Sequence, residues 1–256
     1  MFFIYRTIGS SKIEQAFLDL FYEEFLTEEH DDIYIISPWI TPFSFSKKIV
    51  VYPYIVADNI VDVLLGLVKI GVKVKILTRC IDDLLPLDKL YLVDLILQSA
   101  GDEVNYKVLR EIYDYLINDI KWAINRMKAI ILLSKSGIEI RYDVGEDLYS
   151  NRLHSKMYVG SKKAIIGSAN LTQSGIVDNR GNKEFILVVD REEPLYEKIR
   201  EAAIKYFEQG YNFERCEKRI IRTINRILTE KFISLNDFMK YMERVLISIS
   251  PKTKYR

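Results

Sequence analysis

The sequence predicts a mixed α/β fold (α+β): a mixed β-sheet with helices on both faces, a helical insertion and a helical C-terminal extension. Two observations predict it. Strand and helix patterns alternate through the first 80 residues, the order that builds parallel sheet, and short β-rich runs return after a long stretch of helical periodicity. The 256 residues, 49% of them apolar, suffice for one large domain or for one domain with an appendage.

The predicted elements form two groups, one before residue 80 and one after residue 136. They are a helix over about 10–26, a strand over 33–37, a helix over about 58–71, a strand over 72–78, strands over 138–143, 154–159, 163–167 and 184–190, and a helix over about 194–209. The first helix has an apolar stripe that should cover a sheet, and a loop rich in proline and aromatic residues follows the first strand. The early strand, helix and strand predict a right-handed parallel crossover.

The rest of the chain is expected to be helical. Residues 81–136 and 211–256 show helical periodicity without strand patterns. We therefore predict a principal domain over 1–210, with a helical insertion at about 81–136, and a C-terminal helical extension over 211–256.

Charge and cysteine content exclude several classes of protein. The net charge is +1, so attraction to an anionic polymer must come from a local patch. Cys80 and Cys216 lie far apart, without the spacing of a zinc site or a disulfide framework, which fits a reducing cytoplasm. The first residues lack a signal-peptide pattern, and no window reaches the roughly 18 apolar residues of a membrane helix. We expect a cytoplasmic protein with no integral membrane association.

The stretch RLHSKMYVGSKKAIIGSAN, 152–170, concentrates groups that bind phosphate. Because side chains alternate along a strand, His154, Lys156 and Tyr158 should share one wall. The next predicted strand ends in Gly-Ser-Ala-Asn, where glycine allows a close turn, and Ser168 and Asn170 offer a hydroxyl and an amide at the start of a helix. An imidazole, an ammonium, a hydroxyl, an amide and the positive end of a helix should converge, and this set suits a phosphate.

These residues resemble the signature of the phospholipase D superfamily, His-x-Lys-x4-Asp-x6-Gly-Ser-x-Asn. His154, Lys156 and the Gly-Ser-Ala-Asn run at 167–170 have this spacing, while Ser161 stands at the aspartate position, whose carboxylate supports structure in the family. The segment that leads to Glu184 and the earlier strand and helix patterns are also similar. The resemblance implies a phospholipase D-like mixed sheet flanked by helices.

The resemblance also implies roles for five residues. His154, oriented by Glu184 through its second ring nitrogen, would attack phosphorus and form a phosphohistidine. Lys156, Ser168 and Asn170 would stabilise the charge on the non-bridging oxygens. Neither a metal nor a cofactor is required.

Such a site needs a second group that protonates the leaving oxygen and later activates water. The family supplies it with a second His-x-Lys motif, but the other histidine of this chain, His30, is followed by two aspartates. We therefore expect a homodimer in which a two-fold axis brings two copies of His154 face to face.

Basic residues outside the motif fall into two groups. In the C-terminal extension, a cationic stripe is a candidate for binding nucleic-acid backbone, although a solvated helix face explains the same spacing; it contains Arg215, Lys218, Arg219, Arg222 and Arg226. The insertion has a thinner set, for which we expect an ordinary solvated face: Lys121, Arg126, Lys128 and Lys135.

Three functions are compatible with these patterns. The first is a metal-independent phosphodiesterase that cleaves nucleic acid, with DNA favoured over RNA by analogy with soluble single-motif members of the family. The second is a phospholipid phosphodiesterase or phosphatidyltransferase, which the lack of an anchor or interfacial helix disfavours. The third is a non-catalytic module that binds nucleic acid or protein, for which Ser161 at the aspartate position is the best support.

Overall fold

The structure is a computed structural model, and it describes residues 3–6, 11–51, 55–79, 126, 129–143, 153–177 and 183–212. The chain divides into two compact units, Met1–Cys80 with Asn125–Phe213 and Ile81–Ile124 with Glu214–Arg256, and every described residue belongs to the first unit. The last part of the predicted insertion, 129–135, is helical and buries Ala129, Ile130 and Leu133. Apart from Arg126 and Ser136, the rest of the insertion lies outside the described residues, as does the extension beyond Asn212.

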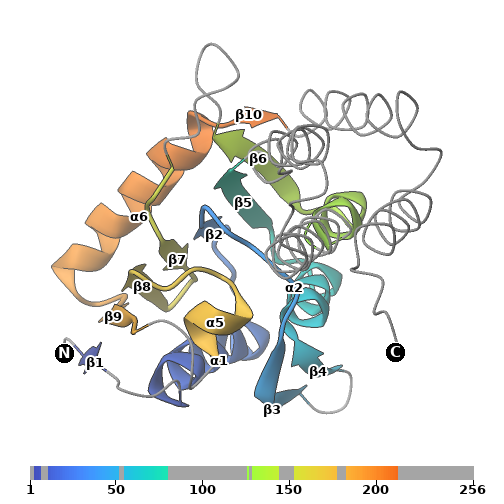
Figure 1. The fold of residues 1–256 in the computed structure, drawn as a ribbon, viewed down its shortest axis with the longest axis horizontal. Coiled ribbons are helices and arrows are strands. Elements are labelled where there is room, and N and C mark those ends of the chain that lie inside the picture. The colour runs from blue at the N-terminus through green and yellow to red at the C-terminus, as the bar shows by residue number, and fades with distance from the viewer. Residues whose placement is uncertain are drawn as a thin grey trace, which may run out of the picture. The chain divides into compact units, whose positions relative to one another are not determined.

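A mixed eight-stranded sheet forms the centre of the first unit (Figure 1). In spatial order its strands are β1 (Phe3–Arg6), β9 (Phe185–Asp190), β8 (Lys163–Gly167), β7 (Met157–Val159), β2 (Ile33–Ile36), β5 (Val74–Arg79), β6 (Glu139–Asp143) and β10 (Tyr211–Asn212). β2, β5 and β6 run parallel to one another, and the other neighbouring pairs are antiparallel. The predicted mixed α/β fold is confirmed.

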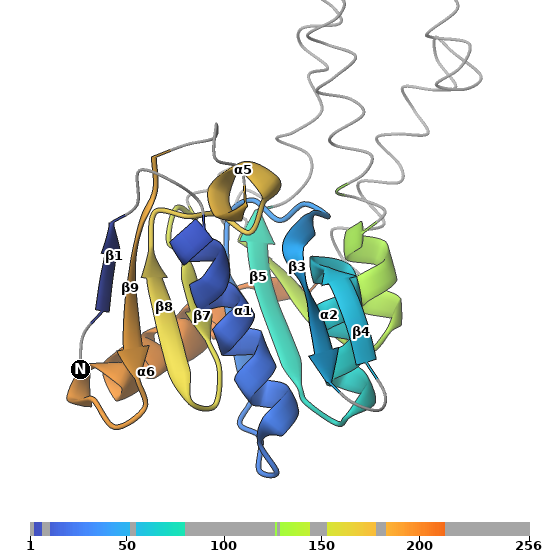
Figure 2. The same cartoon turned by 90° about the horizontal axis from the view of Figure 1, so that it is seen from below.

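Helices cover both faces of this sheet. α6 (Pro194–Glu208) packs on one face against β2, β5, β7, β8 and β9. On the other face, α1 (Ser11–Leu26) contacts β8 and β9, and α2 (Ile60–Lys69) contacts β5. Figure 2 shows α1 and α2 in front of the strands and α6 behind them. No helix within the described ranges is long and apolar enough to cross a membrane.

The boundaries of α2 follow from the residues at its two ends. The side chain of Asn59 accepts a hydrogen bond from the backbone N–H of Asp62 at 2.9 Å, which caps the first turn. Gly71 follows the last turn with φ of 93°, a left-handed conformation that glycine adopts without a Cβ penalty. The chain then enters β5 directly, and this short connection places Arg79 at the far end of that strand.

The core lies on both faces of the central strand β2, whose four residues are all buried. Toward α6, a cluster of buried side chains contains Tyr34, Ile36, Leu77, Leu153, Met157, Val159, Ala164, Val189, Tyr196, Ile199, Ala203 and Phe207. Toward α1, Phe17 packs edge-on against Tyr158, with ring centroids 4.6 Å apart. Burial on both sides explains why the run IYII is uniformly apolar rather than alternating.

The structure differs from the sequence predictions in several strands. The predicted loop after β2 contains an antiparallel hairpin, β3 (Ser44–Val51) and β4 (Ile55–Asn59), which forms a separate sheet. β1 and β10 are short edge strands, and β7 begins at Met157, so His154 and Lys156 precede the strand rather than lie within it. The prolines that punctuate the hairpin region and the brevity of the edge strands hide these elements from periodicity.

Candidate active site

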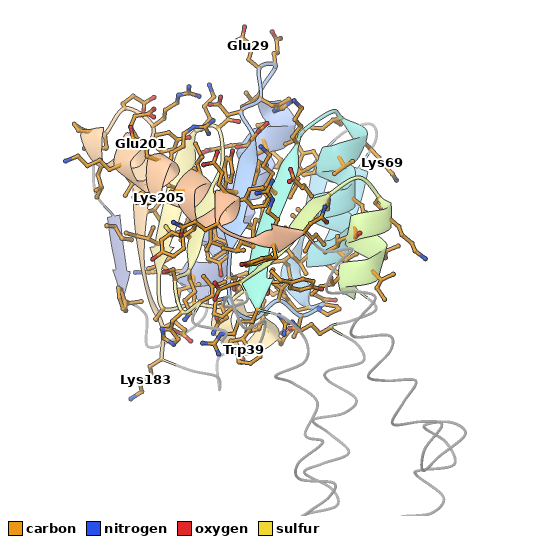
Figure 3. The ribbon with its side chains drawn as sticks, turned by 90° about the horizontal axis from the view of Figure 1, so that it is seen from above. Glu29, Trp39, Lys69, Lys183, Glu201 and Lys205 are labelled. Atoms are coloured by element: carbon orange, nitrogen blue, oxygen red, sulfur yellow. The ribbon has the colours of Figure 1, made fainter. Side chains whose placement is uncertain are left out.

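The motif residues lie at one edge of the sheet, which we call the site edge. β2, β5, β6 and β8 end there, and β7 and β9 begin there, because of the pairing directions. The edge therefore receives His154 and Lys156 before β7, Ser168 and Asn170 after β8, and Glu184 before β9. Figure 3 shows this edge at the bottom, marked by Trp39 and Lys183, with Glu29 at the opposite edge. Ligands usually bind α/β sheets at the carboxyl ends of the parallel strands.

His154 and Lys156 differ sharply in exposure. The His154 side chain is exposed, whereas Lys156 is only 6% exposed. The Nζ of Lys156 donates a hydrogen bond to the backbone carbonyl of His154 at 2.6 Å, so the ammonium is tied to the residue that carries the imidazole. The expected common wall therefore holds only in part, because Tyr158 is buried inside the protein.

The environment of Lys156 destabilises its positive charge. Burial lowers the pKa of the Lys156 ammonium, the carboxylate of Glu184 opposes that effect, and the guanidinium of Arg79 lowers the pKa further. Lys156 is thus a cation close to a second cation, and an anionic ligand would stabilise both of them.

Ser168 connects the end of β8 to Glu184. Its hydroxyl donates to the Glu184 carboxylate and accepts a hydrogen bond from the backbone N–H of Phe185 at 3.0 Å. Gly167 permits this approach, because a Cβ at that position would lie 2.2 Å from the carbonyl oxygen of Phe185. Within the described residues, no hydrogen bond joins Glu184 to His154, so this geometry leaves the proposed orienting role of Glu184 as a prediction.

Asn170 presents an unused acceptor close to the motif. The side chain is half-buried, and its Oδ1 atom is buried without a hydrogen-bond partner among the described residues. The expected helix start differs from the structure: α5 (Gln173–Ile176) has only four residues, and its N-cap is Thr172 rather than Asn170. Because such a short helix has few aligned peptide dipoles, we assign no phosphate binding to its N-terminus.

Two buried side chains, which the sequence did not single out as site residues, hold the Gly-Ser-Ala-Asn loop in place. The hydroxyl of Tyr158 donates to the carbonyl of Ala169 at 2.8 Å, and burial raises the pKa of Tyr158, which keeps the phenol protonated. Ser37, directly after β2, accepts from the N–H of Leu171 at 3.2 Å and donates to the carbonyl of Trp39 at 2.9 Å. The polar residue at the end of an otherwise apolar strand is the sequence signal for Ser37.

Arg79 adds a cationic group that the motif does not contain. It ends β5 and is half-buried, and its Nε donates to the carbonyl of Leu153 at 2.8 Å, one residue before His154. Its guanidinium lies over the Trp39 ring, 5.3 Å from the centroid. Like Ser37, it lies at the end of a predicted strand, and this position is the signal in the sequence.

Arg126 corrects the expectation of a solvated face in the insertion. The side chain is fully buried, and its Nη2 donates to Thr78 Oγ1 at 2.8 Å and to the carbonyl of Arg79 at 3.0 Å. It also donates to the carbonyl of Pro38 at 3.1 Å. Arg126 therefore ties the ends of β2 and β5 together beneath the site edge. Lys135 is exposed, as expected for a solvated face, and Lys121 and Lys128 lie outside the described residues.

Ser161 lies far from the other motif residues, at the turn between β7 and β8. It is fully buried, its hydroxyl donates to Glu24 Oε2 at 2.7 Å, and its backbone N–H donates to the other oxygen of that carboxylate. The N–H of Asp31 donates to the Ser161 hydroxyl at 3.0 Å, and Arg191 donates to its carbonyl at 2.9 Å. Where the family has aspartate, α1 thus supplies a carboxylate from Glu24 to the same turn.

Two sequence predictions receive little or no structural information: the nucleic-acid-binding role of the cationic stripe and the expected independence of a metal. The cationic stripe Arg215, Lys218, Arg219, Arg222 and Arg226 lies outside the described residues. In the part of the chain that is described, no cluster of three or more His, Cys, Asp or Glu side chains could hold a metal ion.

Comparison with known proteins gives one family match and several structural matches. The family described as cardiolipin synthase, PLD-like domain, matches residues 46–210. Nuc from Salmonella typhimurium, a phospholipase D family member, is 16% identical with a TM-score of 0.44, over 83% of this chain and 97% of Nuc. NucT from Helicobacter pylori is 13% identical with a TM-score of 0.45, over 83% of this chain and 99% of NucT.

A third structure, TrmBL2, an archaeal chromatin protein described with a novel mode of DNA binding, is 15% identical with a TM-score of 0.37. That match covers 82% of this chain and 53% of TrmBL2. A search of curated proteins gives no match. The family match extends over more than half of the 256 residues and includes every motif residue from His154 to Glu184. The chain belongs to the phospholipase D superfamily.

Proposed function

We propose that this protein is a metal-independent phosphodiesterase that cleaves nucleic acid, DNA in preference to RNA, in a composite site formed by a homodimer. Membership of the superfamily supports phosphodiester chemistry. The choice of nucleic acid rests on analogy with single-motif members of the superfamily and on the predicted cationic stripe of the C-terminal extension.

The position of the second histidine, His30, is the observation that supports a composite site shared by two protomers. The chain has two histidines, and His30 Nδ1 lies 3.8 Å from the carboxylate of Glu24, which binds Ser161 at the edge opposite His154. His154 and Ser161 are seven residues apart, which corresponds to roughly 20 Å of extended chain. His30 therefore cannot reach a leaving group at His154, and a second imidazole must come from another molecule.

In the first step, an Nε2 lone pair of a neutral His154 attacks phosphorus. The phosphorus–nitrogen bond forms as the bond to the leaving oxygen breaks, and the His154 imidazolium of the second protomer gives its proton to that oxygen. Lys156 and Asn170 offer an ammonium and an amide to the non-bridging oxygens, and Ser168 joins them when its hydroxyl turns from Glu184 to the substrate. The exposure of His154 leaves its ring accessible to both substrate and partner.

In the second step, water attacks the phosphohistidine. The second protomer's imidazole takes a proton from the water and becomes the imidazolium that starts the next cycle, while the phosphorus–nitrogen bond breaks, its electron pair returns to Nε2 and His154 leaves as a neutral group. Lys156 supplies fixed positive charge at this point.

The test is a cleavage assay in EDTA with labelled single-stranded and double-stranded DNA, RNA and a lipid headgroup substrate. We expect cleavage of DNA, slower cleavage of RNA and no headgroup release, and we expect His154→Ala to remove the activity. His30→Gln is the matched control, because it changes the only other histidine at the opposite edge.

Other results of that assay would favour the alternatives. Headgroup release without nucleic-acid cleavage would contradict the nuclease and support a phospholipid enzyme. Tight binding of nucleic acid without turnover would support a non-catalytic module. Activity that disappears in EDTA and returns with added metal would contradict metal independence.

A further inference from the structure

Arg79 is a cation at the site edge that the motif chemistry leaves unused. Its Nε is bound to the carbonyl of Leu153, and neither terminal nitrogen of the guanidinium donates to an atom of the described residues. The guanidinium lies over the Trp39 ring, and the backbone carbonyl of Arg79 accepts from the buried Arg126, so both the side chain and the backbone of Arg79 are held. Arg79 is therefore a preorganised, half-exposed donor pair rather than a mobile surface side chain.

The charges around Arg79 favour an anion. Lys156 is close enough for the two cations to repel each other, and Arg126 lies below, with its guanidinium 5.4 Å from the same Trp39 ring. Among the described residues, the acidic neighbours are Glu184, which binds Ser168, and Asp143, which accepts from the N–H of Leu153. Within this described part of the chain, three cations face two carboxylates that already accept hydrogen bonds, so positive charge is in excess.

The position of Arg79 along the edge indicates which phosphate it would bind. Arg79 ends β5, while Ser168 and Asn170 follow β8, and the ends of β7 and β2 lie between them. At the usual strand spacing, the backbones of β5 and β8 are about 14 Å apart, and the Arg79 side chain spans part of that distance, because its Nε reaches the carbonyl of Leu153 ahead of β7. A phosphate contacts donors within about 3 Å of its oxygens. A ligand that engages both ends of this row therefore carries more than one phosphate.

We propose that Arg79 is a second phosphate-binding group of the site, and that its guanidinium binds the phosphate next to the scissile one in a polynucleotide. The proposal rests on the proposed function, because it assumes that the substrate is a nucleic acid. The stacked, planar guanidinium suits two parallel hydrogen bonds to phosphate oxygens. Arg79 thereby favours polymeric substrates over compounds with one phosphodiester.

The experiment measures binding in a His154→Ala background, so that no substrate is consumed. Affinity is measured for a short single-stranded oligonucleotide with several phosphates and for a dinucleotide with one, with and without Arg79→Gln. Glutamine removes the charge but keeps a donor that can reach the carbonyl of Leu153. Lys73→Gln is the matched control, because it removes one charge at an exposed position just before the opposite end of β5.

We expect Arg79→Gln to weaken oligonucleotide binding about tenfold, and dinucleotide binding clearly less. The dependence of log affinity on log salt should fall by about one unit for the oligonucleotide. Arg79→Lys should restore the salt dependence and part of the affinity, whereas Lys73→Gln should change neither. Rescue by lysine separates a charge effect from simple support of the Leu153 backbone.

Equal losses on the two ligands, or an unchanged salt dependence, would overturn the proposal, as would undetectable oligonucleotide binding in the His154→Ala background. Failure of the proposed function has a different signature. If wild type does not cleave nucleic acid but Arg79 still controls oligonucleotide affinity, only the phosphodiesterase reaction is contradicted. If wild type cleaves DNA and Arg79→Gln has no selective effect, only the role of Arg79 is contradicted.

Discussion

At the site edge, polar groups are held in place with donors or acceptors to spare, whereas at the opposite edge the polar groups of the β7–β8 turn bind one another. His154 is exposed, and the buried Oδ1 of Asn170 has no partner within the described residues. Ser161, by contrast, uses its N–H, carbonyl and hydroxyl in hydrogen bonds to Glu24, Asp31 and Arg191. The same short strand thus has a structural end and an end arranged for a ligand.

This contrast separates two parts of one sequence motif. The histidine, lysine, serine and asparagine gather at the site edge, but the aspartate position belongs to the opposite edge. Replacing that aspartate with Ser161 therefore changes a structural turn, and Glu24 restores a carboxylate there. The substitution gives no physical reason to expect an inactive site.

The largest expected effect on activity comes from replacing the two histidines one at a time. His154→Ala should lower the rate of phosphodiester cleavage by about 10⁴-fold or more, because it removes the nucleophile. The melting temperature should change little, since the side chain is exposed. Single-turnover kinetics measures the effect, and His30→Gln should retain near wild-type activity. Comparable losses in both variants would erase the distinction between the edges.

The next effect in size is expected at Asn170. Asn170→Ala should reduce the cleavage rate by about 10²-fold to 10³-fold, as removal of one preorganised group around a developing charge does. Stability should be preserved or slightly increased, because the buried Oδ1 has no partner within the described residues. Rates are compared with the melting temperature. A large loss of stability with an unchanged rate per folded molecule would assign Asn170 to the scaffold.

A third prediction concerns stability at the opposite edge. Ser161→Asp, which restores the family residue, should destabilise the protein by about 3 kcal/mol, because it buries a second carboxylate against Glu24. Adding Glu24→Gln should recover most of that loss, since an amide can donate to the new carboxylate. Denaturant unfolding of both single variants and the double variant measures the coupling. Additive effects would show that Glu24 does not replace the missing carboxylate.

The smallest effect is a displacement of the pH profile. Because the pKa of Lys156 is lowered, its charge is lost at a lower pH than in an ordinary lysine, and kcat/KM should fall as pH rises through that value. Bound phosphate stabilises the ammonium, so the fall in kcat should come at higher pH. Arg79→Gln should move the kcat/KM limb upward, because Arg79 lowers that pKa. The assignment to Lys156 would be contradicted if the fall at high pH came at the same pH in three profiles: kcat/KM of wild type, kcat of wild type and kcat/KM of Arg79→Gln.

Sequence patterns predicted the parts of the fold that repeat over many residues. The apolar stripe of α1, the buried run of β2 and the crossover through α2 to β5 are all present. The β3–β4 hairpin was missed because Pro42 and Pro53 and the aromatic residues beside them are typical of a loop, and β1 was missed because four residues paired to one neighbour carry too short a signal. Local periodicity reports burial, and these elements depend on pairing instead.

The motif spacing predicted which residues gather at the site but not how they are held. Nothing local indicates that Lys156 turns back to the carbonyl of His154, because this geometry arises where the chain precedes β7. The burial of Arg126 depends on carbonyls and a hydroxyl at the ends of two distant strands. Tertiary contacts of this kind leave no periodic trace in the sequence.

The central claim is that each working site needs His154 from two molecules, and a subunit-mixing titration tests it most directly. Wild type is exchanged with increasing amounts of His154→Ala at constant total protein, and DNA cleavage is measured against the wild-type fraction. If mixed dimers are inactive, activity falls with the square of that fraction, and this is the result we predict. Activity that falls in direct proportion to the wild-type fraction would show that one chain cleaves by itself, and would contradict the account.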